Sequence, residues 1–121
     1  MEKDKYVAYV STYTSGNKSS FGIKIYDVDM NKCRFVEKDQ VEITNSSYVT
    51  ISHNRKYLYS ITDFGVEAYK ILEDGSLQVL NHASINGMRG CYLSTDYEDR
   101  FLFVAGYHDA KLTVLRVEEN G

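Results

Sequence analysis

The chain repeats itself with a period of about 44 residues. Residues 47–61 align with residues 91–105, so that Leu58 falls on Leu102, 44 positions later. Patterned sequence with this period is typical of architectures in which one supersecondary unit buries its apolar faces against copies of itself. The period therefore restricts the possible folds more than any single motif does.

Two further segments extend the repeat. Residues 65–71 align with residues 111–117 at an offset of 46 residues, because the second copy has a longer loop. Residues 6–12 and 22–28 form an earlier, partial copy, so the repeat begins within a unit. Apolar residues alternate with period two inside each copy, which predicts strands whose successive side chains point to opposite faces of a sheet.

The second unit is predicted to hold four short strands, labelled A to D. They cover residues 47–52, 57–62, 66–72 and 77–82 and are separated by segments rich in Asn, Asp, Gly and Ser, which favour turns. Four strands in about 44 residues is the period of a β-propeller blade, with strand A innermost. The chain then consists of strands B-C-D of one blade, A-B-C-D of a second and A-B-C of a third.

The predicted fold is all-β, with four-stranded antiparallel meanders that form about two and a half β-propeller blades of an incomplete ring. We expect a single partial propeller domain over residues 1–121, with blades at about 1–44, 45–86 and 87–121. The predicted strands are fewer than the roughly sixteen that a ring of four blades requires. Because open strand edges invite pairing, we expect either a fragment of a longer chain or self-association through the open blade edges.

Composition and charge exclude several classes of partner. The net charge of −3 is spread along the chain, without the basic cluster that binds phosphates, so no nucleic-acid partner is expected. No stretch approaches the ~20 apolar residues that span a bilayer, and residues 1–10 lack the apolar core of a secretory signal. We therefore expect a cytoplasmic protein without membrane contact.

Cys33 and Cys91 have no zinc-ligand spacing. We expect both to be reduced thiols, and we expect the chain to bind no metal and no cofactor.

Motifs of one known family run along the chain in order. Residues 9–14 read YVSTYT, residues 21–29 read FGIKIYDVD, and residues 91–107 read CYLSTDYEDRFLFVAGY. These resemble YVGTYT, GIYxYxxD and PCHLSVDPDGRFLFVANY of the lactonase-type seven-bladed propellers, the family of bacterial 6-phosphogluconolactonases and fungal muconate-lactonizing enzymes. The resemblance covers essentially the whole chain and implies the N-terminal third of such a propeller. In that family a C-terminal segment supplies the innermost strand of the first blade.

The chain departs from the family motifs at four positions. Residues 45–49 read NSSYV and resemble NPSYLA of the family, so Ser46 stands where this motif has Pro. Gly90, Tyr92 and Gly106 stand where the motif PCHLSVDPDGRFLFVANY has Pro, His and Asn. The resemblance implies the N-terminal part of a sugar-lactone hydrolase, a carboxylic ester hydrolase that would be inactive as this part alone. Because the departures remove polar groups, the alternative is a non-catalytic propeller fragment, or an assembling propeller unit that acts as a binding or scaffold module.

The candidate site lies on the channel rim, where the D-to-A and B-to-C connections meet. Lactone hydrolysis needs a base with a pKa near neutrality and a donor that faces the developing oxyanion. His108 is the only histidine on this rim and is the candidate catalytic base, and Arg89 is the candidate partner of the oxyanion or of a substrate phosphate. The candidate residues for binding a sugar lactone are Tyr13, Asn45, Asp63 and Tyr107.

Each candidate also has a purely structural interpretation. His108 would be a solvated loop residue between Tyr107 and Asp109, Arg89 a loop cation, and Asp63 a cap of its own turn. The tyrosines as a group are expected to pack across strands first and to offer a sugar platform second. A serine nucleophile is not expected, because no GxSxG motif is present.

Overall fold

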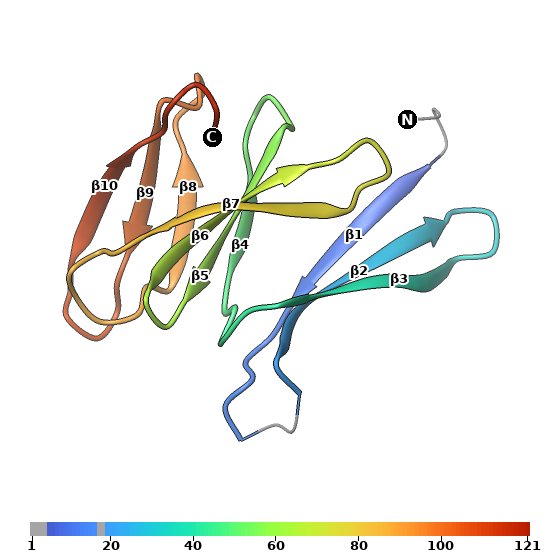
Figure 1. Cartoon of the computed structure of the whole chain (residues 1–121), viewed down its shortest axis with the longest axis horizontal. Helices are drawn as coiled ribbons and strands as arrows, with labels where there is room; N and C mark the ends of the chain where they lie inside the picture. Colours follow the sequence, from blue (N-terminus) through green and yellow to red (C-terminus); the bar gives the residue numbers. More distant parts are fainter. Residues whose placement is uncertain (1–4, 17–18) are drawn as a thin grey trace.

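The computed structural model describes residues 5–16 and 19–121, which form ten β-strands in three antiparallel sheets (Figure 1). In each sheet the strands follow one another in chain order: β1–β3, β4–β7 and β8–β10. This series of three, four and three strands confirms the predicted partial blades. The bounds are β1 Tyr6–Ser11, β2 Phe21–Asp29, β3 Arg34–Glu42, β4 Val49–Ile51, β5 Tyr57–Thr62, β6 Gly65–Ile71, β7 Leu77–Ala83, β8 Tyr92–Thr95, β9 Phe101–Ala105 and β10 Leu112–Arg116.

The inner strand β4 is shorter than the predicted strand at 47–52. The backbone already turns at Ser52, whose carbonyl accepts the N–H of Arg55 at 2.9 Å. Arg55 has a φ of 62°, in the left-handed region that ends an extended strand. The other three strands of this sheet agree with the prediction to within one residue at each end.

The first and second sheets pack face to face through alternating residues of their strands. In β2, Ile23 and Ile25 are fully buried, whereas Lys24 between them and Tyr26 after them remain partly exposed. The two isoleucines pack against Leu58 of β5 and other residues of the second sheet. The period-two pattern therefore places one face of the first sheet against its neighbour.

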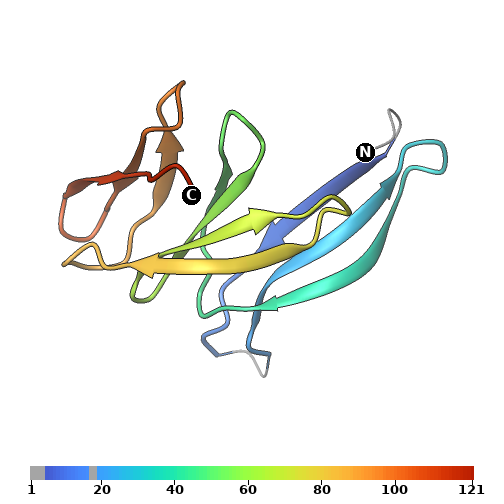
Figure 2. The same ribbon diagram turned by 45° about the horizontal axis from the view of Figure 1, so that its top comes forward.

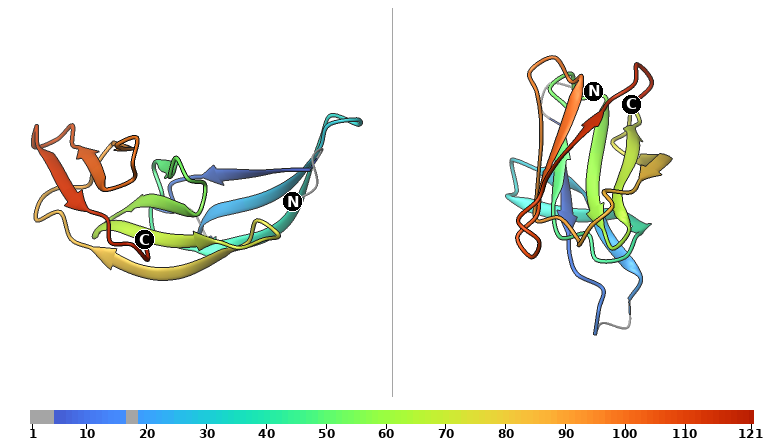
Figure 3. Two further views of the ribbon diagram at one scale, coloured as in Figure 1. Left: turned by 90° about the horizontal axis from the view of Figure 1, so that it is seen from above. Right: turned by 90° about the vertical axis from the view of Figure 1, so that its left-hand side faces the viewer.

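A second apolar cluster joins the second and third sheets. It contains Ile61 and Val66 from the second sheet and Leu93, Leu102 and Val104 from the third. Figures 2 and 3 show the four-stranded sheet between the two three-stranded sheets, which lie at opposite ends of an arc. The two apolar clusters thus pack each sheet against its neighbour in sequence, as the blades of a propeller pack.

Short connections tie neighbouring sheets together at the end that carries the β4–β5 and β8–β9 turns. Asp99 accepts the backbone N–H groups of His53 and Asn54, each at 2.8 Å. Tyr9 of β1 donates a hydrogen bond of 2.6 Å to the carbonyl of Gly75 in the β6–β7 turn. Gly75 has a φ of +90°, and an added Cβ would lie 2.6 Å from a methyl carbon of Val7, so this close approach requires glycine.

The predicted rim connections lie together at the opposite end of the sheets. In Figure 1 the β1–β2, β3–β4, β5–β6, β7–β8 and β9–β10 connections all lie at the lower end of the molecule. Residues 1–4 of the first predicted blade and residues 17–18, in the connection between β1 and β2, lie outside the described residues. Within the described ranges no helix is long and apolar enough to cross a membrane. Cys33 and Cys91 are exposed free thiols.

Candidate functional site

Four of the six predicted site residues meet on the rim. Nη1 of Arg89 donates a hydrogen bond of 2.9 Å to Oδ1 of Asp63. Nδ2 of Asn45 donates to both carboxylate oxygens of Asp63, at 3.0 and 2.9 Å. The guanidinium carbon of Arg89 lies 4.9 Å from the centre of the Tyr13 ring, within the range of a cation–π contact. Connections of all three sheets therefore converge around one carboxylate.

Asn45 is the buried anchor of this cluster. It is 4% exposed, and its Oδ1 accepts the backbone N–H groups of Thr14 and Ser15, each at 2.8 Å. Nδ2 also donates to Oγ of Ser15 at 2.7 Å, so both donors and both lone pairs of the amide are used within the protein. Asn45 has a φ of 48°, which Asn tolerates better than most residues. Its geometry is that of a residue that positions Asp63.

The carboxylate of Asp63 accepts hydrogen bonds from two connections other than its own. Its carboxylate accepts hydrogen bonds from Asn45 and Arg89, and within the described part of the chain it makes none to its own turn. The structural interpretation of Asp63 as the cap of its own turn is therefore wrong. The carboxylate instead joins the connection before β4 to the connection before β8, and it holds Arg89 in one orientation.

Arg89 presents a fixed, partly exposed guanidinium. One edge of the guanidinium faces Asp63 and its plane lies near the ring of Tyr13. The hydrogen bonds of the described residues leave Nε and Nη2 of Arg89 without a protein partner. These two groups are donors that a carboxylate, a phosphate or a carbonyl oxygen could accept. The adjacent carboxylate offsets the charge of Arg89, so directed hydrogen bonds rather than net attraction would dominate any contact.

Tyr107 and His108 lie in a separate loop. Their rings meet edge to face with centres 5.4 Å apart, and both side chains are exposed. No hydrogen bond or ion pair of the described residues links either of them to Arg89. Asp109 ties this loop to the β7–β8 connection, because it accepts the N–H of Met88 at 3.0 Å, and this hydrogen bond holds the pKa of Asp109 below its usual value.

The repeat contains a signal that the sequence prediction did not use. Asn45 and Arg89 occupy the same repeat position, 44 residues apart, and each contacts the B-to-C connection of the preceding sheet. The same offset relates Tyr48 to Tyr92, whose rings lie 4.8 Å apart with 43° between their planes. Tyr92 is also the position where the family motif has His, so this aromatic pair belongs among the candidates.

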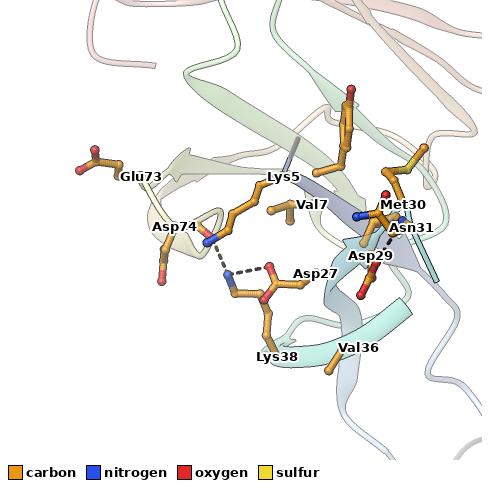
Figure 4. Close-up of a pocket in the computed structure, with 12 residues that line it drawn as sticks. Lys5, Val7, Asp27, Asp29, Met30, Asn31, Val36, Lys38, Glu73 and Asp74 are labelled. Carbon is orange, nitrogen blue, oxygen red and sulfur yellow. Dashed lines mark hydrogen bonds and ion pairs between the residues drawn. The ribbon is translucent and has the colours of Figure 1, made fainter. Parts of the chain in front are cut away.

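A hollow lies at the end of the first sheet that is opposite the rim (Figure 4). Its volume is about 920 Å³, between the first sheet and the β6–β7 turn, and none of the predicted site residues lines it. Nζ of Lys38 crosses it, donating to Oδ1 of Asp27 at 3.2 Å and to the carbonyl of Asp74. These contacts join the two sheets, which is a structural role.

Stacked antiparallel meanders whose connections converge on one rim define the chain as part of a β-propeller. The family model for lactonase with a seven-bladed β-propeller matches residues 7–121. The chain therefore belongs to the lactonase family of seven-bladed β-propellers, and the family resemblance of its motifs is confirmed.

Relatives of this chain include known lactonases. The 6-phosphogluconolactonase of Bacillus subtilis is 38% identical over 123 residues, which cover 97% of this chain and 35% of the relative. The 6-phosphogluconolactonase of Formosa agariphila is 30% identical over 121 residues, covering 93% of this chain and 34% of the relative. The chain thus spans about a third of the length of the curated relatives that it matches.

Solved structures agree with this assignment. A crystal structure from Bacteroides fragilis superposes with a TM-score of 0.87 at 28% identity, over 98% of this chain and 34% of that one. The periplasmic gluconolactonase of Pseudomonas aeruginosa superposes with a TM-score of 0.83 at 26% identity, over 97% of this chain and 36% of that one. These shares of the solved chains agree with the fold, because two and a half blades are about a third of a seven-bladed ring.

Proposed function

We propose that this chain forms the N-terminal blades of a sugar-lactone hydrolase whose substrate is a 6-phosphogluconolactone-like ester. The observation that carries the proposal is the network of Arg89, Asp63 and Asn45, which fixes a guanidinium on the channel rim of a lactonase-family propeller. The names of the relatives support the substrate class. The two and a half blades would contribute to a site that further blades complete.

In the proposed reaction, the oxygen of a water molecule bonds to the lactone carbonyl carbon and the ring C–O bond then breaks to give the hydroxy acid. His108 accepts a proton from the attacking water and then donates this proton to the departing ring oxygen. Arg89 donates from the edge that Asp63 leaves open, either to the developing oxyanion or to the substrate phosphate. Tyr13 and Tyr107 border the substrate, while Asn45 and Asp63 hold Arg89 in place.

The chain alone is expected to be inactive. A phosphorylated substrate needs several cations on the rim, whereas Arg89 is already paired with Asp63 and Nζ of Lys111 donates to the carbonyl of Asn86 at 2.9 Å. The remaining cations would come from blades beyond these. We place the protein in the cytoplasm as part of this proposal, and the two exposed free thiols support a reducing compartment.

The test is a chimera that joins residues 1–121 to the remaining two thirds of the Bacillus subtilis relative. We expect it to hydrolyse 6-phosphogluconolactone faster than the spontaneous reaction, whereas the chain alone does not. Arg89→Ala and His108→Ala should each lower kcat/KM by about tenfold or more, and Cys33→Ser serves as the matched exposed control. A folded chimera without any rate enhancement would overturn the proposal.

A binding module is the second candidate function, favoured by the stacked Tyr48 and Tyr92. Two adjacent aromatic rings offer an apolar surface on which a sugar ring can lie. The same chimera distinguishes the two functions, since a binding module would retain a gluconate ligand in calorimetry without accelerating lactone hydrolysis. Binding that is lost in Tyr92→Ala and kept in Arg89→Ala would support this candidate.

A further inference from the structure

Each cation on the described part of the rim has a carboxylate beside it. Among the described residues of the rim connections, the cationic side chains are Arg89 and Lys111. Arg89 pairs with Asp63 at 2.9 Å. Lys111 lies two residues after Asp109, whose carboxylate accepts the backbone N–H of Lys111 at 3.3 Å and is influenced by its charge. These four charges cancel, so this part of the rim offers no net attraction to an anion.

The carboxylate of Asp63 is fixed beside Arg89. Its oxygens accept hydrogen bonds from Nδ2 of Asn45 at 3.0 and 2.9 Å and from Nη1 of Arg89 at 2.9 Å. Asn45 is a rigid support for this arrangement, because it is buried and its own Oδ1 is bonded to the backbone. A ligand that binds Arg89 therefore meets the negative charge of Asp63 at the same time.

The acid at position 63 is particular to the second sheet. Tyr13 and Tyr107 occupy the same repeat position in the first and third sheets, 50 residues earlier and 44 residues later. The repeat therefore does not require a carboxylate here. The acid stands at the position to which Arg89 donates, so it is associated with Arg89 and not with the propeller turn.

The open edge of Arg89 suits an uncharged acceptor. The hydrogen bonds of the described residues use neither Nε nor Nη2 of Arg89, and the ring of Tyr13 lies 4.9 Å from the guanidinium carbon. A lactone carries two oxygens on one carbon, and both accept hydrogen bonds without a formal charge. A phosphate in the same place would face the carboxylate of Asp63, and like charges placed side by side oppose binding.

We propose that Asp63 determines the orientation of the substrate, because it directs Arg89 to the uncharged lactone group and excludes the phosphate end from this part of the rim. This inference rests on the proposed function and decides between the two contacts of Arg89 given there. The phosphate end then binds to cations of further blades. Asp63 is a specificity-determining residue that acts through Arg89.

The same carboxylate favours release of the product. Hydrolysis opens the lactone to a carboxylic acid, which loses its proton to the solvent at neutral pH. The new carboxylate then lies at the open edge of Arg89, close to the like charge of Asp63. Asp63 therefore weakens the binding of the hydroxy acid relative to that of the lactone.

The first test removes the phosphate from the substrate. In the chimera of residues 1–121 with the remaining two thirds of the Bacillus subtilis relative, kcat/KM is measured for 6-phosphogluconolactone and for unphosphorylated glucono-δ-lactone, with and without Arg89→Ala. Because Arg89 contacts the lactone group, the variant should lose the same factor, within about twofold, with both substrates. A loss confined to the phosphorylated substrate would place the phosphate at Arg89 and overturn the proposal.

The second test removes the charge of Asp63. Asp63→Asn should strengthen inhibition by 6-phosphogluconate and by inorganic phosphate about fivefold or more at low salt, because the charge of Arg89 is then unopposed. Adding Arg89→Ala should abolish this gain. Asp39→Asn, on the exposed part of β3, removes the same charge elsewhere and is the matched control. Unchanged inhibition in a folded Asp63→Asn variant would overturn the role of Asp63, and the comparison of the two substrates needs no change at this position.

Binding measurements separate this inference from the proposed function. A folded chimera that hydrolyses neither lactone would refute the proposed function, and calorimetry with inorganic phosphate and with glucono-δ-lactam, an uncharged analogue of the lactone, then tests Asp63. We expect Arg89→Ala to weaken lactam binding about tenfold or more, and phosphate to bind at Arg89 only after Asp63→Asn. Absent or Arg89-independent lactam binding would overturn the inference, as would Arg89-dependent phosphate binding by the unaltered chimera.

Discussion

The hydroxyl of Tyr9 donates a hydrogen bond of 2.6 Å to the carbonyl of Gly75, which joins the first sheet to the β6–β7 turn of the second. Tyr59 occupies the same repeat position in the second sheet, since it pairs with Ala68 as Tyr9 pairs with Ile25. The Tyr59 hydroxyl is buried and has no hydrogen-bond partner among the described residues. Two equivalent tyrosines therefore differ in one hydrogen bond.

Replacing these tyrosines by phenylalanine should give opposite results. Tyr9→Phe leaves the Gly75 carbonyl without its partner and should lower the free energy of unfolding by about 1 kcal/mol. Tyr59→Phe removes a buried hydroxyl that makes no bond, so it should leave the stability unchanged or raise it. Urea denaturation of the two variants measures both effects. Equal losses in the two variants would contradict the role of the Tyr9 hydrogen bond.

Stability should fall at alkaline pH. Burial, together with the nearby charge of Asp74, raises the pKa of Tyr9 from 10.0 to about 12. The neutral phenol is thus favoured in the folded state, and this contribution is complete below pH 10 and is lost as the pH rises through the folded pKa. Tyr9→Phe should make the free energy of unfolding less dependent on pH between about pH 10 and about pH 12. An unchanged pH profile would show that Tyr9 does not titrate in this way.

The buried amide of Asn45 should be among the most sensitive positions of the rim. Asn45→Ala leaves the N–H groups of Thr14 and Ser15 without an acceptor, and it places alanine at a φ of 48°. We expect a loss of about 2–4 kcal/mol in the free energy of unfolding. Asn86→Ala is the matched control, because Asn86 has a φ of 52° but is exposed. It should lose less, and a loss as large as that of Asn45→Ala would assign the whole effect to backbone conformation.

The repeat was sufficient to predict the strand order and the open ends of the fold. Period-two alternation places Ile23 and Ile25 on one face, and the offset of 44 residues superimposes successive sheets, so local pattern and long-range packing agree. The end of β4 could not be predicted, because the chain turns at Ser52 toward the left-handed backbone of Arg55. That conformation follows from the turn hydrogen bonds and not from the apolar pattern.

The rim shows why contacts within a site are harder to predict than its location. The order of connections was enough to place Tyr13, Asn45, Asp63 and Arg89 on one rim. Their mutual contacts depend on side chains that reach from one sheet to the next, as Arg89 does toward Asp63 and Tyr13. His108 lies on a connection of the same rim, but its loop is held by Asp109 and its side chain contacts Tyr107. The catalytic role of His108 stays a prediction.

Asp99 should stabilise the contact between the second and third sheets most strongly above acidic pH. Burial opposes ionisation of its carboxyl group, but the N–H groups of His53 and Asn54 outweigh burial and hold the pKa of Asp99 below its usual value of 3.8. This stabilising contribution of Asp99 is complete above the usual pKa and is lost as the pH falls through the lower folded pKa.

Asp99→Asn keeps the side-chain shape at a φ of 56°, which Asn tolerates. It should cost about 1–2 kcal/mol at neutral pH, and the difference from the wild type should narrow on acidification. Asp39→Asn, on the exposed part of β3, controls for the loss of one negative charge, and an Asp99→Asn deficit that stays constant down to acidic pH would rule out the ionised carboxylate as its cause.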